Sequence, residues 1–135
     1  GVVFGPHPRS YRQRTPRKMK RLAIKVLLSD KAREDCIIVL QDIFLEQPST
    51  KQMSEILDNL GVESASLIVT REPNHNLVKS VANLKRVQVV PAHTLNAIAL
   101  LNCRTLLLTV DAVRKAEEVW GSPFVRIKKK ISAAV

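Results

Sequence analysis

Glycine and aromatic residues are scarce in this chain of 135 residues. Its four glycines are Gly1, Gly5, Gly61 and Gly121, and none of them builds a glycine-rich turn between an expected strand and an expected helix. Such a turn lets the backbone approach a pyrophosphate, so its absence argues against a dinucleotide or ATP site. Aromatic residues make up 4% of the chain, which argues against an RNA-binding platform built from several stacked rings.

Cysteine and histidine are also too few and too scattered to indicate a metal site. Cys36 and Cys103 lie far apart, each beside apolar residues, so we expect two buried, reduced thiols. His7, His75 and His93 fall in separate segments, and we expect them at the surface. A catalytic thiol is not expected either, because Cys36 has no basic residue beside it to activate it. The sequence therefore predicts no metal, no cofactor and no catalytic residue.

Long apolar runs are missing as well. No run approaches the roughly 20 residues that span a bilayer, so no membrane contact is expected. The N-terminal segment does not resemble a signal peptide, because its basic residues follow the apolar ones. The sequence begins without methionine, and we expect a processed or truncated product, or the end of a longer chain.

Acidic residues are absent from both ends of the chain. Residues 1–25 hold eight basic residues and no acidic one, and residues 126–130 hold four basic residues and no acidic one. The stretch between them carries ten basic residues and all twelve acidic ones, within a net charge of +10. A nearly neutral body with basic extensions is typical of a protein that binds a polyphosphate.

The first fifteen residues have no hydrophobic periodicity and contain Pro6 and Pro8, which predicts an extended arm. A run of charge is often only a solvated surface. Here no acidic residue is available for local ion pairs, and Phe4 and Tyr11 offer stacking beside the arginines. His7 lies between the prolines and is a further candidate RNA contact. We expect such an arm to become ordered on its partner.

A helix is expected to follow, with Thr15 as its cap and Pro16 at its first position. Its apolar residues recur at helical spacing, which predicts one core-facing side made of Met19, Leu22, Ala23, Val26 and Leu27. Three basic residues recur on another side, which predicts an outward stripe made of Lys18, Arg21 and Lys25.

Beyond this helix, strands and helices alternate. Strands are expected at 37–40, 66–70, 87–90 and 105–109, and the run 37–40 is typical of a strand covered on both faces. Helices are expected at 49–60, 74–84 and 94–101, and finally from Thr109 or Asp111 to Trp120. Ser49 and Gln52 suggest a capping box, and Gly61 a helix end. Trp120 is expected to anchor the last helix in the core.

This alternation predicts an α/β fold: a largely parallel sheet of about four strands with helices on both faces. The strand order stays open. We expect three parts, an extended basic arm at 1–15, a globular α/β domain at 16–121 and a basic tail at 122–135.

The segments Gly1–Tyr11 and Pro16–Ala23 resemble the signature of a known family, bacterial-type large-subunit ribosomal protein four. Weaker similarity continues in order through Leu57–Gly61, Leu95–Asn96 and Thr105–Val113, so the resemblance covers residues 1 to 121. It implies an α/β domain that binds large-subunit rRNA and helps the subunit assemble. Some members of the family also repress their own messenger RNA.

The resemblance implies that Phe4, Arg9, Tyr11, Arg12 and Arg14 are the returning stem of a long loop that lies against RNA. It also implies that Arg17, Lys18, Arg21 and Lys25 face RNA from the first helix. The chain departs from the family in two ways. An N-terminal portion of the family is absent, and residues 122–135 extend past the usual end, where they either bind peripheral RNA or form a solvated tail.

The sequence therefore predicts a structural constituent of the large ribosomal subunit, located in a bacterial or organellar ribosome. Its expected partners are large-subunit rRNA and neighbouring large-subunit proteins, with its own messenger RNA as a further candidate. Two other classes stay open. An α/β RNA-modifying enzyme would need a cofactor-sized pocket at the strand ends, and a protein adaptor would use the acidic middle of the chain. The expected RNA-binding residues are Phe4, His7, Arg9, Tyr11, Arg12, Arg14, Arg17, Lys18, Lys20, Arg21, Lys25, Arg126, Lys128, Lys129 and Lys130.

Overall fold

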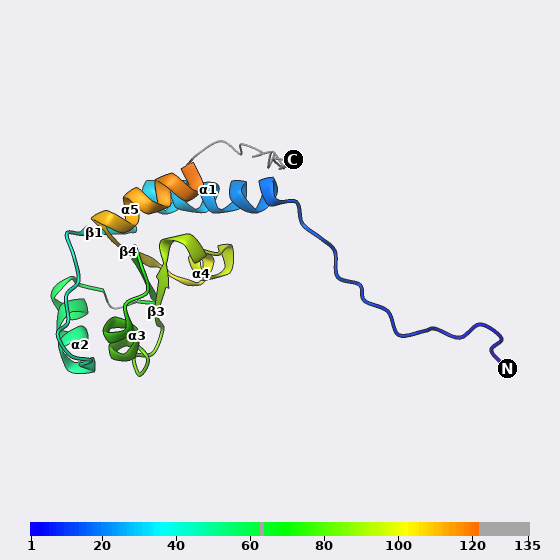
Figure 1. Ribbon diagram of the computed structural model, residues 1–135, viewed down its shortest axis with the longest axis horizontal. Helices are drawn as coiled ribbons and strands as arrows, with labels where there is room; N and C mark the ends of the chain where they lie inside the picture. Colours follow the sequence, from blue (N-terminus) through cyan, green and yellow to red (C-terminus); the bar gives the residue numbers. More distant parts are fainter. Residues whose placement is uncertain (63, 122–135) are drawn as a thin grey trace, which may run out of the picture.

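The computed structural model describes residues 1–62 and 64–121, and it confirms the α/β fold (Figure 1). Within these residues, four parallel strands form one sheet in the order β1-β4-β2-β3. The bounds of the strands are Ile37–Leu40 for β1, Ser66–Thr70 for β2, Val87–Pro91 for β3 and Thr105–Thr109 for β4. The central pair is in register from Ser66 opposite Thr105 to Val69 opposite Leu108.

Helices cover both faces of this sheet, as expected. The helices α2 (Thr50–Asn59) and α3 (His75–Val81) pack on one face, where Ile68 and Leu107 are buried. The helices α1 (Arg17–Arg33), α4 (Ala97–Asn102) and α5 (Val110–Ala116) belong to the other face. Alternation along β4 divides the core, because Leu106 and Leu108 point to the opposite side from Leu107.

Local capping explains where α2 begins and ends. The Ser49 hydroxyl accepts a hydrogen bond from the Gln52 backbone N–H at 3.3 Å. The second bond of the expected capping box does not involve Gln52, because the Ser49 N–H donates to the Ser80 hydroxyl at 2.9 Å. At the other end, Gly61 adopts a φ of +66°, which favours glycine, and its N–H donates to the Asp58 carbonyl.

The later helices begin at side-chain caps. Asn74, Asn96 and Thr109 each accept a bond from a backbone N–H of the helix that follows. Expected bounds differ here: α3 ends at Val81 rather than Leu84, and a short 3₁₀ turn at Ala92–Thr94 precedes α4. A π-helical turn, Glu117–Gly121, follows α5. Trp120 anchors this turn as expected, since its indole N–H donates to the Ala92 carbonyl at 2.8 Å.

The expectation that strand 37–40 is covered on both faces is wrong. The strand β1 lies at the edge of the sheet and pairs with β4 alone among the described strands, and Val39 is exposed. A continuous β-branched run is typical of buried parallel strands, but it does not say whether a strand is central or at an edge.

The orientation of α1 also corrects the sequence-based expectation. Thr15 does not cap the helix, because Pro16 occupies the cap position without a side-chain bond. Ile24 is buried, and Leu27 and Leu28 pack against the same core. Four of the five expected core residues instead lie exposed: Met19, Leu22, Ala23 and Val26. The helix therefore has two apolar sides. Of the residues expected to face the core, only Leu27 packs against it.

The replacement of Ile24 by alanine is therefore expected to lower the free energy of unfolding by about 2–4 kcal/mol, because the Ile24 side chain is 4% exposed. Leu22→Ala, at a side chain 61% exposed, serves as the control and should change it by less than about 0.5 kcal/mol. Urea unfolding of both variants makes the comparison. A larger loss for Leu22→Ala would contradict the observed orientation of α1.

Candidate nucleic-acid interface

The first fifteen residues extend away from the α/β body (Figure 1). All of them except Gly5 are exposed, including Phe4, His7 and Tyr11. The contacts within this arm are local: the Arg9 guanidinium lies 4.7 Å from the centre of the Tyr11 ring, and the Arg12 N–H donates to the Ser10 hydroxyl. The cations and rings of the arm are therefore accessible to a partner.

Where the arm meets α1, its basic residues come together with those of the first helical turn. Arg12, Arg14 and Lys20 line a hollow of 360 Å³, and Arg14, Arg17 and Lys20 line a second one of 460 Å³. No carboxylate lines either hollow. Four cations around adjacent concave surfaces form a strongly positive site that suits phosphate groups. The sequence indicated these residues individually, but it did not show that they converge.

The expected basic stripe on α1 is divided by the fold. Lys18 is exposed, as predicted. Arg21 and Lys25 are half-buried, and the Lys25 ammonium donates to the Gly121 carbonyl at 3.2 Å. The prediction that they face outward is wrong, because both lie on the helix beside the core-facing Ile24. Arg126, Lys128, Lys129 and Lys130 lie outside the described residues.

An apolar groove adjoins these cations, and sequence reasoning missed it. The groove has a volume of 800 Å³ and lies between the first half of α1, the start of α4 and the Glu117–Gly121 turn. Met19, Ile98 and Trp120 contribute to its lining, with Arg17 and Lys20 beside them. The exposed side chains of Met19 on α1 and Ile98 on α4 were the available signal, but each helix also has a buried side.

A cavity of 400 Å³ lies at the carboxyl ends of the strands, where cofactors bind in many parallel sheets. Its polar side chains are largely occupied: Thr109 and Asn74 cap helices, and the Thr70 hydroxyl donates to the Glu72 carbonyl. Asp42, Glu72 and Asp111 would also repel a phosphate, against Arg71 alone. The enzyme alternative required a pocket here, and the pocket found is poorly suited to a nucleotide.

The described residues contain no group of three or more histidine, cysteine or acidic side chains that could hold a metal ion. The three histidines are exposed, as expected. Both cysteines are free: Cys103 is buried, as expected, whereas Cys36 is only half-buried. Among residues 1–62 and 64–121, no helix has the length and apolar character needed to cross a bilayer.

The two thiols are expected to differ in reactivity. Burial raises the pKa of Cys103, although the nearby Lys31 ammonium partly opposes this effect. Since the thiolate is the reactive form, iodoacetamide at about pH 8 should modify Cys36 at least about tenfold faster than Cys103 in the folded chain. Mass spectrometry of the alkylated peptides measures both rates, and equal rates in urea serve as the control. Fast modification of Cys103 in the folded chain would contradict the observed packing.

Comparison with known proteins places this sequence in a family. Residues 1–119 match the model of the ribosomal protein L4/L1 family. Relatives described as large ribosomal subunit protein uL4 match as well. The protein from Desulforudis audaxviator is 47% identical over 119 residues, and that from Carboxydothermus hydrogenoformans is 45% identical over 120 residues. The protein from Lactobacillus johnsonii is 44% identical over 119 residues.

These matches cover 88–89% of the present chain. The chain belongs to the ribosomal protein L4/L1 family. It spans only 57–58% of the length of the curated relatives, which are bacterial proteins of the large ribosomal subunit. The resemblance inferred from the sequence is thus confirmed at the level of the family.

Proposed function

We propose that this chain is the rRNA-binding, non-catalytic part of a large ribosomal subunit protein, and that it supports assembly of the subunit. The observation that carries the proposal is the cluster of Arg12, Arg14, Arg17 and Lys20 around two hollows without carboxylates. The names of the relatives support the ribosomal context.

In this proposal each part of the interface has a distinct role. The cations at the junction bind backbone phosphates, because the arginine fork matches phosphate oxygens. Phe4 and Tyr11 stack on unpaired bases, and Arg9, held against Tyr11, extends that surface. His7 and Lys18 are both exposed and add polar contacts. Arg21 and Lys25 contribute less, because the fold draws both toward the body.

The test is binding of the whole chain to fragments of large-subunit rRNA over a range of salt concentrations, with small-subunit rRNA as the matched control. If about 6–10 phosphates are contacted, the affinity should fall about 10³–10⁵-fold between 50 and 200 mM salt. Protection of a discrete large-subunit segment in hydroxyl-radical footprinting would support the proposal. Equal affinity for both rRNAs, with no discrete footprint, would overturn it.

Regulation of the chain's own messenger RNA stays a prediction and would use the same surface. A leader transcript that competes with rRNA for the chain, and loses affinity with the same arm variants, would support it. Continued binding of both RNAs at once would contradict a shared surface.

A further inference from the structure

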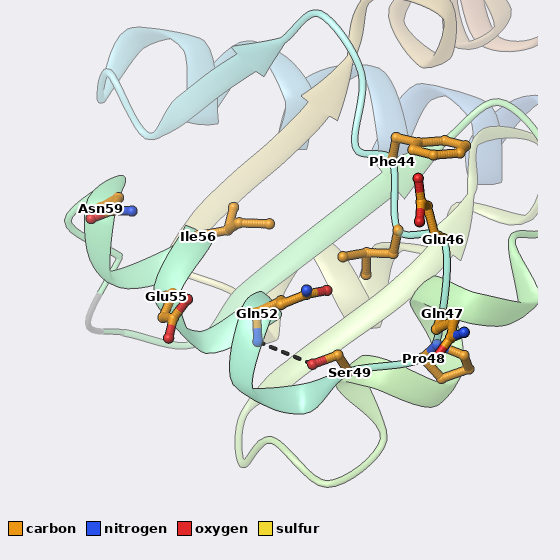
Figure 2. Close-up of a pocket in the computed structure, with 10 residues that line it drawn as sticks. Phe44, Glu46, Gln47, Pro48, Ser49, Gln52, Glu55, Ile56 and Asn59 are labelled. Carbon is orange, nitrogen blue, oxygen red and sulfur yellow. Dashed lines mark hydrogen bonds between the residues drawn. The ribbon is translucent and has the colours of Figure 1, made fainter.

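A cleft lies between the loop after β1 and the helix α2 (Figure 2). The helix α2 lies on the body, away from the arm (Figure 1). Its volume is 820 Å³, which falls in the range of about 300–1,000 Å³ that is common for ligand-binding pockets. Figure 2 shows Phe44 and Glu46 on the loop, with Gln52 and Ile56 on the facing side of α2. We call it the loop–α2 cleft.

The loop that forms one wall is firmly held. Ile43 and Leu45 are buried on either side of Phe44, so the alternation of the backbone turns the Phe44 ring outward, where it is 77% exposed. The Asn76 amide donates to the Leu45 and Glu46 carbonyls, at 3.1 Å each. The bond from the Ser49 N–H to the Ser80 hydroxyl fixes the end of the loop. Phe44 is therefore displayed by an ordered backbone, which lowers the entropic cost of binding through it.

The cleft is also acidic. Glu46 and Glu55 line it, and no basic side chain does. Neither carboxylate forms an ion pair with a described residue. The surrounding sequence has the same character, because the stretch from Glu34 to Thr70 holds seven acidic residues and one basic residue, Lys51. Such a surface repels nucleic acid, so it differs in kind from the arm.

Lone exposed aromatic rings are common on protein surfaces and need no partner. Here, however, the ring borders a concave site whose other apolar residue, Ile56, is half-buried on α2. Amide side chains from Gln47, Gln52 and Asn59 line the same cleft and can bond to an extended backbone. Apolar contact, amide donors and acceptors, and unpaired carboxylates together specify a cationic polypeptide.

We propose that the loop–α2 cleft binds an extended, arginine- and lysine-containing segment of a neighbouring protein. Aliphatic side chains of that segment contact Phe44 and Ile56, and its cations pair with Glu46 and Glu55. Charge complementarity selects this occupant over RNA. The surface lies apart from the proposed rRNA site and bears the opposite charge, so the proposal does not depend on rRNA binding.

The probe is a fluorescein-labelled nine-residue peptide in which arginine alternates with leucine, and fluorescence anisotropy measures its binding to the whole chain. A peptide with glutamate in place of arginine is its control. Phe44→Ala should weaken binding about tenfold, since anchoring aromatic residues carry much of the energy of such contacts. The double variant Glu46→Gln with Glu55→Gln should weaken it about tenfold as well.

The matched control is the double variant Glu34→Gln with Glu117→Gln, which removes the same charge at exposed sites outside the cleft and should change the affinity less than about twofold. Equal losses in the two double variants would reduce the binding to general electrostatics and overturn the proposal. Changes in amide chemical shift that leave residues 44–59 unaffected would also overturn it.

Two further measurements separate the possible outcomes. Phe44→Ala should leave the affinity for rRNA unchanged, so the two proposals can fail independently. Self-association of the chain that is lost in Phe44→Ala would assign the cleft to the basic arm of a second copy, which would overturn the proposal of a neighbouring protein.

Discussion

The replacement of Arg9, Arg12 and Arg14 by alanine is expected to weaken binding to large-subunit rRNA about 100-fold at about 100 mM salt. Each arginine that neutralises a phosphate releases counterions, so the slope of log affinity against log salt should become shallower by about three. The arm makes only the local contacts described above, so the melting temperature should not change. Filter binding over salt, together with a thermal melt, measures both effects.

A second triple variant provides the matched control. This variant combines Lys51→Ala, Lys79→Ala and Lys85→Ala, and it also lowers the net charge from +10 to +7. The three lysines are exposed and lie on α2, on α3 and just after α3, respectively. We expect less than about threefold loss of affinity from this variant, because it removes no arginine of the arm. Equal losses in both variants would show that net charge, and not the arm, determines binding. A lower melting temperature in the arginine variant would instead make the arm part of the fold.

The largest effect on stability is expected from Leu107→Ala. This side chain is 0% exposed at the centre of β4, between the neighbouring strands β1 and β2 and beneath α2 and α3. Loss of the side chain leaves a cavity that the packed sheet cannot close, which should cost about 3–5 kcal/mol. Against a total stability of about 5–15 kcal/mol for a domain, this is a large fraction.

Thermal unfolding should show the effect as a fall in the melting temperature of about 10–20 °C. Ile98→Ala is the control, because the Ile98 side chain on α4 is 72% exposed and its loss should change stability by no more than about 0.5 kcal/mol. Similar melting temperatures for the two variants would contradict the assignment of Leu107 to the core. Binding of rRNA to the folded fraction of Leu107→Ala should be preserved, since the arm is remote from this site.

Most of the elements could be predicted from the sequence because their signals are local. The four strand segments were confirmed almost to the residue, since each is a short apolar run between helices. Ser49, Asn74 and Thr109 mark helix starts through bonds to backbone groups only three residues away. Gly61 marks a helix end because a positive φ costs glycine little. None of these features depends on a distant part of the chain.

The candidate interface was predicted less completely. The arginines of the arm were visible because no acidic residue lies near them in the sequence. Their meeting with Arg17 and Lys20 depends on the direction in which the arm leaves α1, which no local pattern encodes. The loop–α2 cleft was not predicted, because Phe44 lies in a loop, where the sequence does not indicate which side chains are buried.

The sequence by itself determined the segregation of charge, the alternation of strands and helices and the starts of α2, α3 and α5, because each of these follows from neighbouring residues. Only the tertiary structure decided which side of α1 faces the sheet. Met19, Leu22 and Val26 form one apolar side of this helix, and Ile24, Leu27 and Leu28 form the other. Helical periodicity allows either side to be buried. In the folded chain the second side packs against the core. This orientation of the helix also brings Arg21 and Lys25 toward the body.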